Sequence, residues 1–457
     1  MGVLELIGNT PLVEITRLDI GRARLFLKLE QQNPGGSIKD RIALSMIEAA
    51  ERENKIKPGS LIVEATAGNT GLGLALVAAL KGYRLLIVVP DKMSQEKIFH
   101  LKAMSAEVVL TRSDVKKGHP EYYQDLAAKL ARETPGAFYV NQFANPANPL
   151  AHERTTGPEI WEQMQHDVDA VVAGVGTGGT LTGLSRFFER VAPQAEMVLA
   201  DPAGSVLFNY IKTGQIVNEV GSWLVEGIGE DFIPPVCDLS RVRKAYGIPD
   251  AEAFMVCREL LKKEGIMAGT STGTLVAAAL RWCREQKEPK RVMTFACDTG
   301  NKYLSKLFND FWMEDQGFIQ RTQYGDLRDL IGRLHGERAT IIVGPDDVLT
   351  TAHNRLRNAG FSQLPVMEGD KLVGFIDEDD IMRHAFGDPE RFNDPVRKAM
   401  HMNFLVVEPS LSLRNLVAML DVQPYAAVMS GGQFYGLITR ADVLNYLRRQ
   451  MGAATTH

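Results

Sequence analysis

The chain has 457 residues, a formal net charge of −5, four cysteines and 45% hydrophobic residues. Its length suffices for about three domain-sized units. The charge gives no sign of a surface for nucleic acid or an acidic membrane, and no apolar run approaches the roughly 18 residues that span a bilayer. The scattered cysteines lack metal-ligand spacing and are typical of free thiols in a reducing compartment. We therefore expect a cytoplasmic protein of several domains that binds no metal.

The first informative segment lies near the N-terminus. Residues 23–30 alternate like a strand, and a helical pattern begins near Ile38, directly after Asn-Pro-Gly-Gly-Ser at 33–37. Lys39 is therefore predicted at a helix start, where the positive end of the helix dipole favours the neutral amine. A neutral lysine can form a Schiff base with pyridoxal phosphate, an electron-sink cofactor. Most lysines at helix starts are solvated surface residues, so Lys39 alone does not establish a cofactor site and further motifs are needed.

Two later strand-to-helix turns are suited to hold such a cofactor. Residues 64–71 read Glu-Ala-Thr-Ala-Gly-Asn-Thr-Gly and follow the predicted strand 61–63. Their hydroxyl, amide and N–H groups suit a carboxylate or a phenolic oxygen, although for this segment alone an N-cap motif is the better explanation. Residues 174–180 read Gly-Val-Gly-Thr-Gly-Gly-Thr before a predicted helix at 181–190. Glycines and a helix N-terminus form a phosphate site, and the alternative is a tight turn without a ligand.

Strands and helices alternate from about residue 10 to residue 310. Further strand patterns lie at 85–89, 107–110, 196–200 and 292–296. This alternation predicts an α/β fold with parallel sheets covered by helices.

In this order, the segments resemble the fold-type II pyridoxal phosphate enzymes of the cysteine synthase and cystathionine β-synthase family. The similarity runs from Ile-Gly-Asn-Thr-Pro-Leu at 7–12 to about Met313, and it includes residues 90–94, 141–146 and 226–234. The resemblance implies a catalytic domain over residues 1–313, built from two parallel-sheet subdomains with the cofactor between them. The smaller one, about 42–145, would close over substrate.

The resemblance also implies roles for individual residues. Lys39 would form the Schiff base with the cofactor. The other cofactor-binding residues would be Asn69 at the 3′-oxygen, Gly176, Thr177, Gly178, Gly179 and Thr180 at the phosphate, and Ser271 at the pyridine nitrogen. The substrate-binding residues would be Thr66, Ala67, Gly68, Thr70, Gln142, Gly229 and Glu230. A neutral hydroxyl at the pyridine nitrogen makes the ring a weaker electron sink, which favours β-elimination.

The implied reaction is a cystathionine β-synthase reaction, in which serine and homocysteine form cystathionine through an aminoacrylate intermediate. Such an enzyme can also release hydrogen sulfide from cysteine. Ala67 replaces the usual serine of its loop, and Glu230 stands where relatives carry tyrosine or a small residue. The choice of second substrate is therefore open, and the alternative is a cysteine synthase that uses O-acetylserine and sulfide. A sensing or scaffold protein with an inactive cofactor domain is a third interpretation, which intact Lys39 disfavours.

Haem is not expected, because the sequence starts directly at the catalytic pattern, without the haem-binding extension of animal cystathionine β-synthases. No basic start and long apolar core of a signal peptide is present either.

The C-terminal third contains an internal repeat. Gly374 corresponds to Gly436 and Asp380 to Asp442, both 62 residues apart, and each copy follows the pattern helix, strand, turn, strand, helix. We expect a linker over 314–332 and a module over 333–457, with copies at about 333–395 and 396–450. The pair resembles the regulatory motifs named after cystathionine β-synthase, also called a Bateman module.

In that motif family, clefts between the copies often bind adenosyl nucleotides. The resemblance points to Asp380 and Asp442 for the ribose hydroxyls and to Thr439 just upstream. The acidic run 377–380 would repel a polyphosphate, so S-adenosylmethionine or AMP is expected rather than ATP. The alternative is that both aspartates merely begin helices of a spacer or dimerisation unit. The family leads us to expect a homodimer or a higher homo-oligomer.

Overall fold

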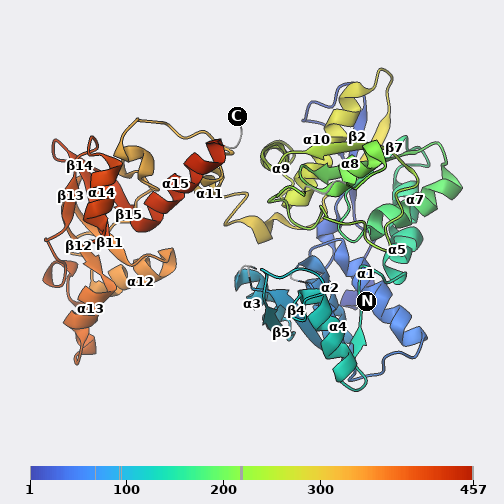
Figure 1. Cartoon of the computed structure of the whole chain (residues 1–457), viewed down its shortest axis with the longest axis horizontal. Helices are drawn as coiled ribbons and strands as arrows, with labels where there is room; N and C mark the ends of the chain where they lie inside the picture. The colour runs from blue at the N-terminus through green and yellow to red at the C-terminus, as the bar shows by residue number, and fades with distance from the viewer. Residues whose placement is uncertain (1, 67, 92, 94, 217–219, 455–457) are drawn as a thin grey trace. The chain divides into compact units, whose positions relative to one another are not determined.

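The chain forms two compact units, Met1–Phe308 and Asn309–His457. The structure is a computed structural model that describes residues 2–66, 68–91, 93, 95–216 and 220–454. Figure 1 shows both units, with labels on many of their helices and strands. Within these described residues, no helix is both long and apolar enough to cross a membrane.

The larger sheet of the first unit has six strands in the order β1-β2-β10-β7-β8-β9. All neighbouring strands are parallel except β1 and β2. The strand bounds are β1 Leu12–Ile15, β2 Arg24–Lys28, β7 Ala170–Ala173, β8 Glu196–Pro202, β9 Val242–Ile248 and β10 Arg291–Phe295. The central strand β7 is buried along its whole length, as expected for a parallel sheet with both faces covered.

Helices and short turns connect these strands. The helix bounds are α5 Ala147–Ala151, α6 Gly157–Gln163, α7 Gly179–Val191, α8 Val206–Thr213, α9 Asp250–Glu264 and α10 Thr270–Glu285. A π-helical turn, His152–Thr156, joins α5 to α6, and the 3-10 turns are Val3–Leu6, Glu30–Gln32 and Gly300–Tyr303.

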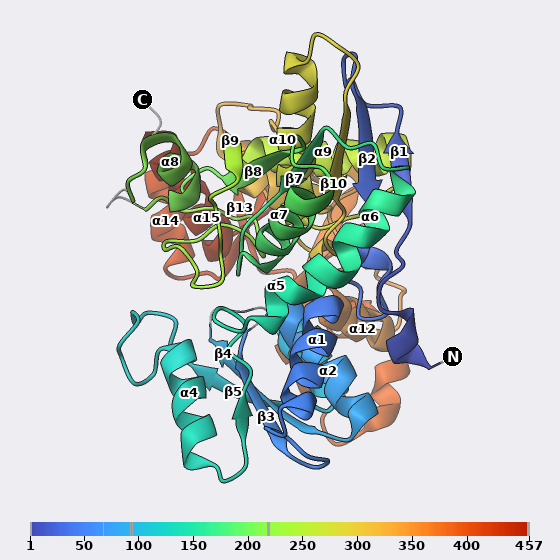
Figure 2. The same ribbon diagram turned by 90° about the vertical axis from the view of Figure 1, so that its right-hand side faces the viewer.

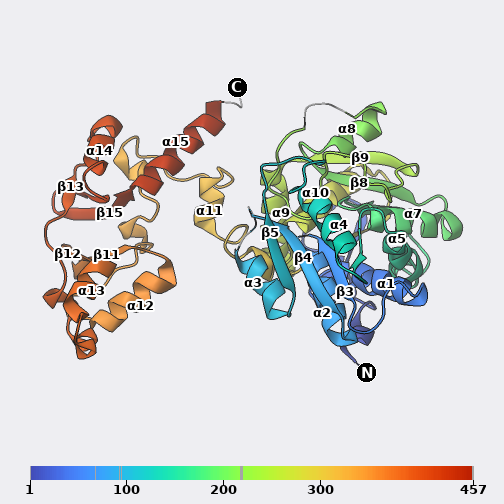
Figure 3. The same ribbon diagram turned by 60° about the horizontal axis from the view of Figure 1, so that its bottom comes forward.

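The smaller sheet has four parallel strands in the order β5-β4-β3-β6. Figure 3 shows β5, β4 and β3 side by side, and Figure 2 shows α1 packed along α2. The bounds are β3 Leu61–Ala65, β4 Arg84–Pro90, β5 Glu107–Thr111, β6 Phe138–Tyr139, α1 Lys39–Arg52, α2 Asn69–Lys81, α3 Gln95–Ala103 and α4 Tyr123–Glu133. Helices α1 and α2 share one core with this sheet, and α4 forms a separate cluster with β3 and β4.

This architecture confirms the predicted fold class, and the expected strands at 61–63, 85–89, 107–110, 196–200 and 292–296 are all present within one to two residues. Two strands of different sheets, β3 and β7, each lead through a glycine-containing turn into a helix. Ligand sites form outside the carboxyl ends of parallel strands, so both turns are placed where such a site is expected.

A buried ionic network fixes the helix start that carries Lys39. Arg41 bonds Glu30 through Nε at 2.7 Å and Glu159 through Nη1 at 2.7 Å. The Lys28 ammonium donates to Glu159 at 2.8 Å. Buried charges persist in a fold only when they are paired in this way, and the network holds α1 against β2 and α6.

The second unit contains two copies of the predicted unit of helix, strand, turn, strand and helix. Copy 1 consists of α12 Leu349–Ala359, β11 Gln363–Glu368, β12 Lys371–Asp377 and α13 Glu378–Ala385. Copy 2 consists of α14 Leu413–Leu420, β14 Tyr425–Ser430, β15 Gln433–Thr439 and α15 Arg440–Ala454, with β13 Leu405–Val407 beside β14. Each hairpin shifts register at the equivalent point, Val366/Met367 and Val428/Met429, which supports a true structural repeat.

The segment before copy 1 belongs structurally to copy 2. It begins with helix α11, Asp310–Asp315, and continues through the 3-10 turns Leu327–Leu330 and His335–Glu337. Leu327, Leu330 and Ile331 are buried in one cluster with residues of β13, β14 and α14. The remaining 3-10 turns of the unit are Pro389–Asn393 and Val396–Lys398.

Candidate functional site

One cavity of the first unit collects the residues that the sequence assigned to a cofactor. Lys39 begins α1, Asn69 begins α2, and Ser271 is the second residue of α10. Its lining is Ile38, Lys39, Asn69, Ala173, Gly174, Gly176, Thr177, Gly178, Gly179, Thr180, Gly227, Ile228, Ser271, Leu275, Phe295 and Cys297. The N-termini of α1, α2, α7 and α10, which lie far apart in the sequence, therefore meet at this cavity.

The Lys39 amine has no hydrogen-bond partner among the described residues. Burial lowers the pKa of Lys39, while Cys297, Asp298 and Glu230 act in the opposite direction. The predicted direction of this shift is correct, but its main cause is burial rather than the helix dipole. A neutral, unpartnered amine is nucleophilic and can also act as a base.

The loop 176–180 is shaped for close backbone approach. A Cβ on Gly176 would lie 2.5 Å from the carbonyl oxygen of Gly227, and Gly178 has a φ of +84°. The N–H groups of Gly176, Thr177 and Gly178 bond no acceptor in the described part of the chain. Because they stand at the N-terminus of α7, they fit the phosphate of a cofactor bound at Lys39.

Asn148 supports this loop and was not identified from the sequence. Its side-chain nitrogen donates to Thr177 Oγ1 and to the carbonyl of Gln142, both at 2.9 Å. Its buried Oδ1 atom has no hydrogen-bond partner among the described residues, and a Cβ on Gly179 would lie only 1.8 Å from it. Glycine at 179 is thus required by the contact with Asn148.

The predicted carboxylate-binding residues flank the cavity. The Thr70 hydroxyl donates to Gln142 Oε1 at 2.7 Å, and the Gly68 N–H donates to Thr66 Oγ1 at 3.2 Å. Because the carbonyl oxygen of the Gln142 amide accepts from Thr70, the amide nitrogen keeps both N–H groups for a substrate carboxylate. Ala67 lies outside the described residues.

Glu64, at the end of β3, was not identified from the sequence. Its carboxylate accepts the N–H of Ala65 at 2.8 Å and that of Gln142 at 3.1 Å, so it links the β3 turn to Gln142. Burial raises the pKa of Glu64 to about 7. An acid inside the apolar run 61–65 is the signal that could have revealed it.

Ser271 and Cys297 both line the cavity. Ser271 is 4% exposed and its hydroxyl bonds the Cys297 thiol. Burial raises the pKa of Cys297 to about 12, so this thiol stays protonated. Ser271 thus lines the cavity, and its expected place at the pyridine nitrogen stays a prediction.

Gly229 and Glu230 belong to a loop that packs on the phosphate turn. The N–H of Gly229 donates to the carbonyl of Val175 at 2.8 Å, and Gly229 has a φ of +91°. Burial, together with Asp231 and Asp201, raises the pKa of Glu230 to about 8, and Lys39 opposes that shift. Glu230 therefore lies within electrostatic reach of Lys39 and is protonated at neutral pH.

The second unit contains a cavity of about 650 Å³ near the start of α15. Two of the three residues predicted for a nucleotide, Thr439 and Asp442, line it. The Thr439 hydroxyl and N–H both donate to Asp442 Oδ2, at 2.6 and 2.7 Å. Residues Phe311, Glu314 and Asp315 of α11 line it as well, so the cavity includes the helix that begins the unit.

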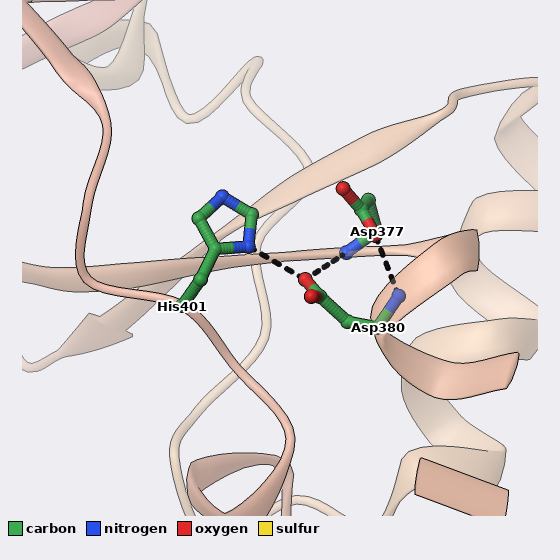
Figure 4. A group of neighbouring side chains, drawn as sticks. All are labelled: Asp377, Asp380 and His401. Atoms are coloured by element: carbon green, nitrogen blue, oxygen red, sulfur yellow. Dashed lines mark hydrogen bonds and ion pairs between the residues drawn. The ribbon is translucent and has the colours of Figure 1, made fainter. Parts of the chain in front are cut away.

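Asp380, the equivalent residue of copy 1, does not line this cavity. Figure 4 shows its carboxylate bonded by the N–H of Asp377 and by His401. These bonds are 3.2 and 2.6 Å long, and the other His401 nitrogen bonds the Tyr425 hydroxyl at 2.8 Å. Asp377, Asp380 and His401 lie within 4.8 Å of one another, as metal ligands would, but their facing atoms already bond each other.

Comparison with protein families gives two matches. The family model of the pyridoxal-phosphate dependent enzymes matches residues 3–298, and that of the CBS domain matches residues 337–387. The sequence is 34% identical to the cystathionine beta-synthase of Apis mellifera, over 98% of this chain and 90% of that protein. It is 37% identical to the cystathionine beta-synthase of Rattus norvegicus, over 93% of this chain and 77% of that one.

Two solved structures resemble the first unit. One is a hydrogen sulfide-producing enzyme from Fusobacterium nucleatum, 38% identical with a TM-score of 0.62, which covers 66% of this chain and 99% of its own. The other is an O-ureido-L-serine synthase, 34% identical with a TM-score of 0.63, which covers 68% of this chain and 98% of its own. The resemblance inferred from the motifs is thereby confirmed, and the CBS-domain match lies in the second unit.

Proposed function

Because the chain belongs to the pyridoxal-phosphate dependent enzymes and, among them, to the cystathionine beta-synthases, we propose that it condenses L-serine with L-homocysteine to L-cystathionine. The observation that carries this proposal is the cavity in which Lys39, Asn69, Ser271 and the loop 176–180 converge. Pyridoxal phosphate bound there supplies an electron sink that acidifies the α-proton of an amino acid.

Lys39, the phosphate loop and the Gln142 amide then have separate roles. Lys39 holds the cofactor and, once released, removes the proton from the substrate α-carbon and later returns it, because burial lowers the pKa of its amine, which has no hydrogen-bond partner among the described residues. The N–H groups of Gly176, Thr177 and Gly178 bind the cofactor phosphate. The two free N–H groups of the Gln142 amide bind the substrate carboxylate and orient the α-proton toward Lys39.

The β-hydroxyl of serine is a poor leaving group, so a proton must reach it as it departs. Lys39 carries the α-proton at that moment and is placed to deliver it. The protonated carboxyl of Glu230 lies near Lys39 and constitutes a second acid at the same end of the site.

A cysteine synthase that uses O-acetylserine and sulfide is the alternative, and it is not favoured. The curated relatives that match nearly the whole chain include the cystathionine beta-synthases of Apis mellifera and Rattus norvegicus. One structural relative of the first unit is a hydrogen sulfide-producing enzyme, which supports cysteine as a further substrate here.

The test is a product assay on the purified, cofactor-loaded protein. Serine with homocysteine, O-acetylserine with sulfide, and cysteine with homocysteine are supplied in parallel, and products are measured by mass spectrometry. We expect cystathionine from the first pair at the highest kcat/KM. Turnover restricted to O-acetylserine and sulfide would overturn the proposal. The cofactor-free protein is the control.

We also propose that the C-terminal unit binds an adenosyl nucleotide in the cavity at Asp442. In that cavity, Asp442 is suited to the ribose hydroxyls, while the Arg333 guanidinium stacks over Phe311 at 5.1 Å and over Phe361 at 4.7 Å. Arg333 has no acidic partner among the described residues, so an anionic nucleotide such as AMP fits better than cationic S-adenosylmethionine. Since α11 lines the cavity, a bound nucleotide would also contact the start of the unit.

Isothermal titration with AMP, S-adenosylmethionine and ATP tests this site. Saturable binding of AMP that weakens in Arg333→Met supports it, and the exposed Arg383→Met is the matched control. Absence of binding by all three nucleotides would leave the module as a device for assembly.

The remaining proposals concern organisation. We propose a catalytic domain over residues 1–313 and a regulatory pair, with the expected linker 314–332 packed onto copy 2 of that pair, assembled as a homodimer or a larger homo-oligomer in the cytoplasm. A chain that ends at residue 313 contains all residues of the cofactor cavity. It should fold and bind pyridoxal phosphate with less than about twofold loss of affinity, as measured by equilibrium dialysis. An insoluble or cofactor-free truncation would contradict independent domains, and sedimentation of the full chain tests the oligomeric state.

A further inference from the structure

Asn69 is held in the cofactor cavity by residues from the far end of the first unit. The ammonium of Lys302 donates to Asn69 Oδ1 at 2.6 Å. The side-chain nitrogen of Asn69 donates to Asp298 Oδ2 at 2.9 Å, and the Tyr303 hydroxyl donates to the same oxygen at 2.8 Å. More than two hundred residues separate Asn69 from these partners along the chain.

These two partners fix the orientation of the Asn69 amide. A lysine ammonium has only donors, and a carboxylate has only acceptors. The amide oxygen must therefore face Lys302 and the nitrogen must face Asp298, because a flipped amide would oppose donor to donor and acceptor to acceptor. One of the two N–H groups is used by Asp298, so one N–H remains for a ligand in the cavity.

Lys302 is also placed against the segment that leads to Lys39. A Cβ on Gly36 would lie 3.9 Å from Lys302 Nζ, and Lys302 is partly buried in the turn Gly300–Tyr303. Burial lowers the pKa of Lys302, and the carboxylates of Asp298 and Asp40 oppose that shift. Lys302 thus joins two segments of the cavity, one that carries the amine and one that carries the amide.

We propose that Lys302 is a positioning residue for the cofactor: it aims the free N–H of Asn69 at the cofactor's 3′-oxygen and, through that bond, favours the ionised oxygen. A charged donor strengthens its own hydrogen bond and polarises the next one in the chain. Lys302 does not itself touch the reacting atoms. The inference rests on the proposed function, because it requires pyridoxal phosphate at Lys39.

Three variants of the full chain test this role. Lys302→Met removes both the donor and the charge, Lys302→Gln keeps a donor without the charge, and Lys302→Arg keeps the charge. Lys290→Met is the control, because Lys290 also donates a side-chain hydrogen bond, to Asp169 at 2.8 Å, outside the residues that line the cavity. Cofactor affinity is measured by equilibrium dialysis, and the visible absorption of the bound cofactor is followed against pH.

Lys302→Met should bind the cofactor about tenfold more weakly, the effect of one charge-assisted hydrogen bond. Its spectrum should lose the long-wavelength band of the ionised 3′-oxygen, a change that mere loss of stability would not cause. Lys302→Gln should show the spectral change with a smaller loss of affinity, and Lys302→Arg and Lys290→Met should resemble the wild type.

If Lys302→Met and Lys302→Gln keep the wild-type spectrum and affinity, Lys302 has only a structural role and the inference is wrong. If Lys302→Met fails to fold, the spectrum of Lys302→Gln decides alone. A wild-type protein that gains no visible band with pyridoxal phosphate would instead refute the proposed function, so the two failures are distinguishable.

Discussion

Lys39 in the first unit and two aspartates in the second, Asp380 and Asp442, all lie at helix starts, but only the aspartates have a charge that suits this position. Lys39 opens α1 at the positive end of the helix dipole, where a charged ammonium is unfavourable, and its amine has no hydrogen-bond partner within the described chain. Asp380 and Asp442 lie in the first turn of α13 and α15, where a negative charge is favourable, and both carboxylates accept N–H groups. Residues that conflict with their local surroundings mark function, whereas residues that agree with them serve stability first.

The largest effect that this comparison predicts is at Lys39. Lys39→Ala should lower turnover of serine and homocysteine by about 10³-fold or more, because the base and the attachment point of the cofactor are lost. The same change should leave the free energy of unfolding of the cofactor-free protein equal or higher, since it removes a buried amine that bonds nothing. Product assays and urea unfolding measure the two effects.

Normal turnover in Lys39→Ala would remove Lys39 from the mechanism. Lys57→Ala provides the matched control, because this lysine is exposed and belongs to the loop before β3. We expect both its turnover and its stability to equal those of the wild type.

A smaller effect is expected at Asp442. Asp442→Ala should weaken AMP binding about tenfold or more, since a hydrogen bond to a charged group is lost. Asp380→Ala should leave binding unchanged, because Asp380 does not line that cavity and its carboxylate is bonded by His401 and the N–H of Asp377. Isothermal titration of both variants compares the two copies directly, and equal losses in both would show that the copies do not differ.

At Asp380 the expected effect is local stability. Asp380→Ala removes the capping box with Asp377 and should cost about 1 kcal/mol, which is about fivefold faster hydrogen exchange at the start of α13. The neighbouring Asp379 is exposed, and its nearest cation, Arg383, is 4.0 Å away. Asp379→Ala should therefore change exchange by less than about twofold. A similar rate for both variants would contradict the capping role.

The contrast between copies also shows what the sequence predicts well. The order of elements, the repeat and the cofactor motifs follow from local patterns, namely strand runs, glycine turns and helix starts. The carboxylate of Asp380 is bonded by His401, and His401 in turn bonds Tyr425. These two residues lie 21 and 45 positions further along the chain than Asp380. No local pattern contains that information.

Long-range polar contacts account for the other omissions. Lys302 and Asn69 meet only because α2 and the end of the large sheet face the same cavity. Asn148 was missed for the same reason, since its partners lie on the phosphate loop and on the turn after β6. Glu64 differs, because an acid within a buried strand is unusual by itself and predicts a structural or catalytic bond.

The smallest expected effect is at Glu230, where burial disfavours the charged form of the side chain, as it does at Lys39. Its carboxyl has no hydrogen-bond partner among the described residues, and burial raises its pKa to about 8, from an ordinary value near 4.5. Between these two pH values the folded state holds a proton that the unfolded state has lost. Stability must therefore fall as pH rises from about 4.5 to 8 and stay low above that.

Glu230→Gln removes this titration while preserving size and polarity. We expect the variant to match the wild type in free energy of unfolding near pH 5 and to exceed it by about 1 kcal/mol at pH 9, a modest gain because the side chain keeps some solvent contact. Urea unfolding of the cofactor-free proteins at both pH values measures the difference. A gap that is independent of pH would mean that Glu230 is already ionised in the fold, and would place it with the partnered carboxylates of the second unit rather than with Lys39.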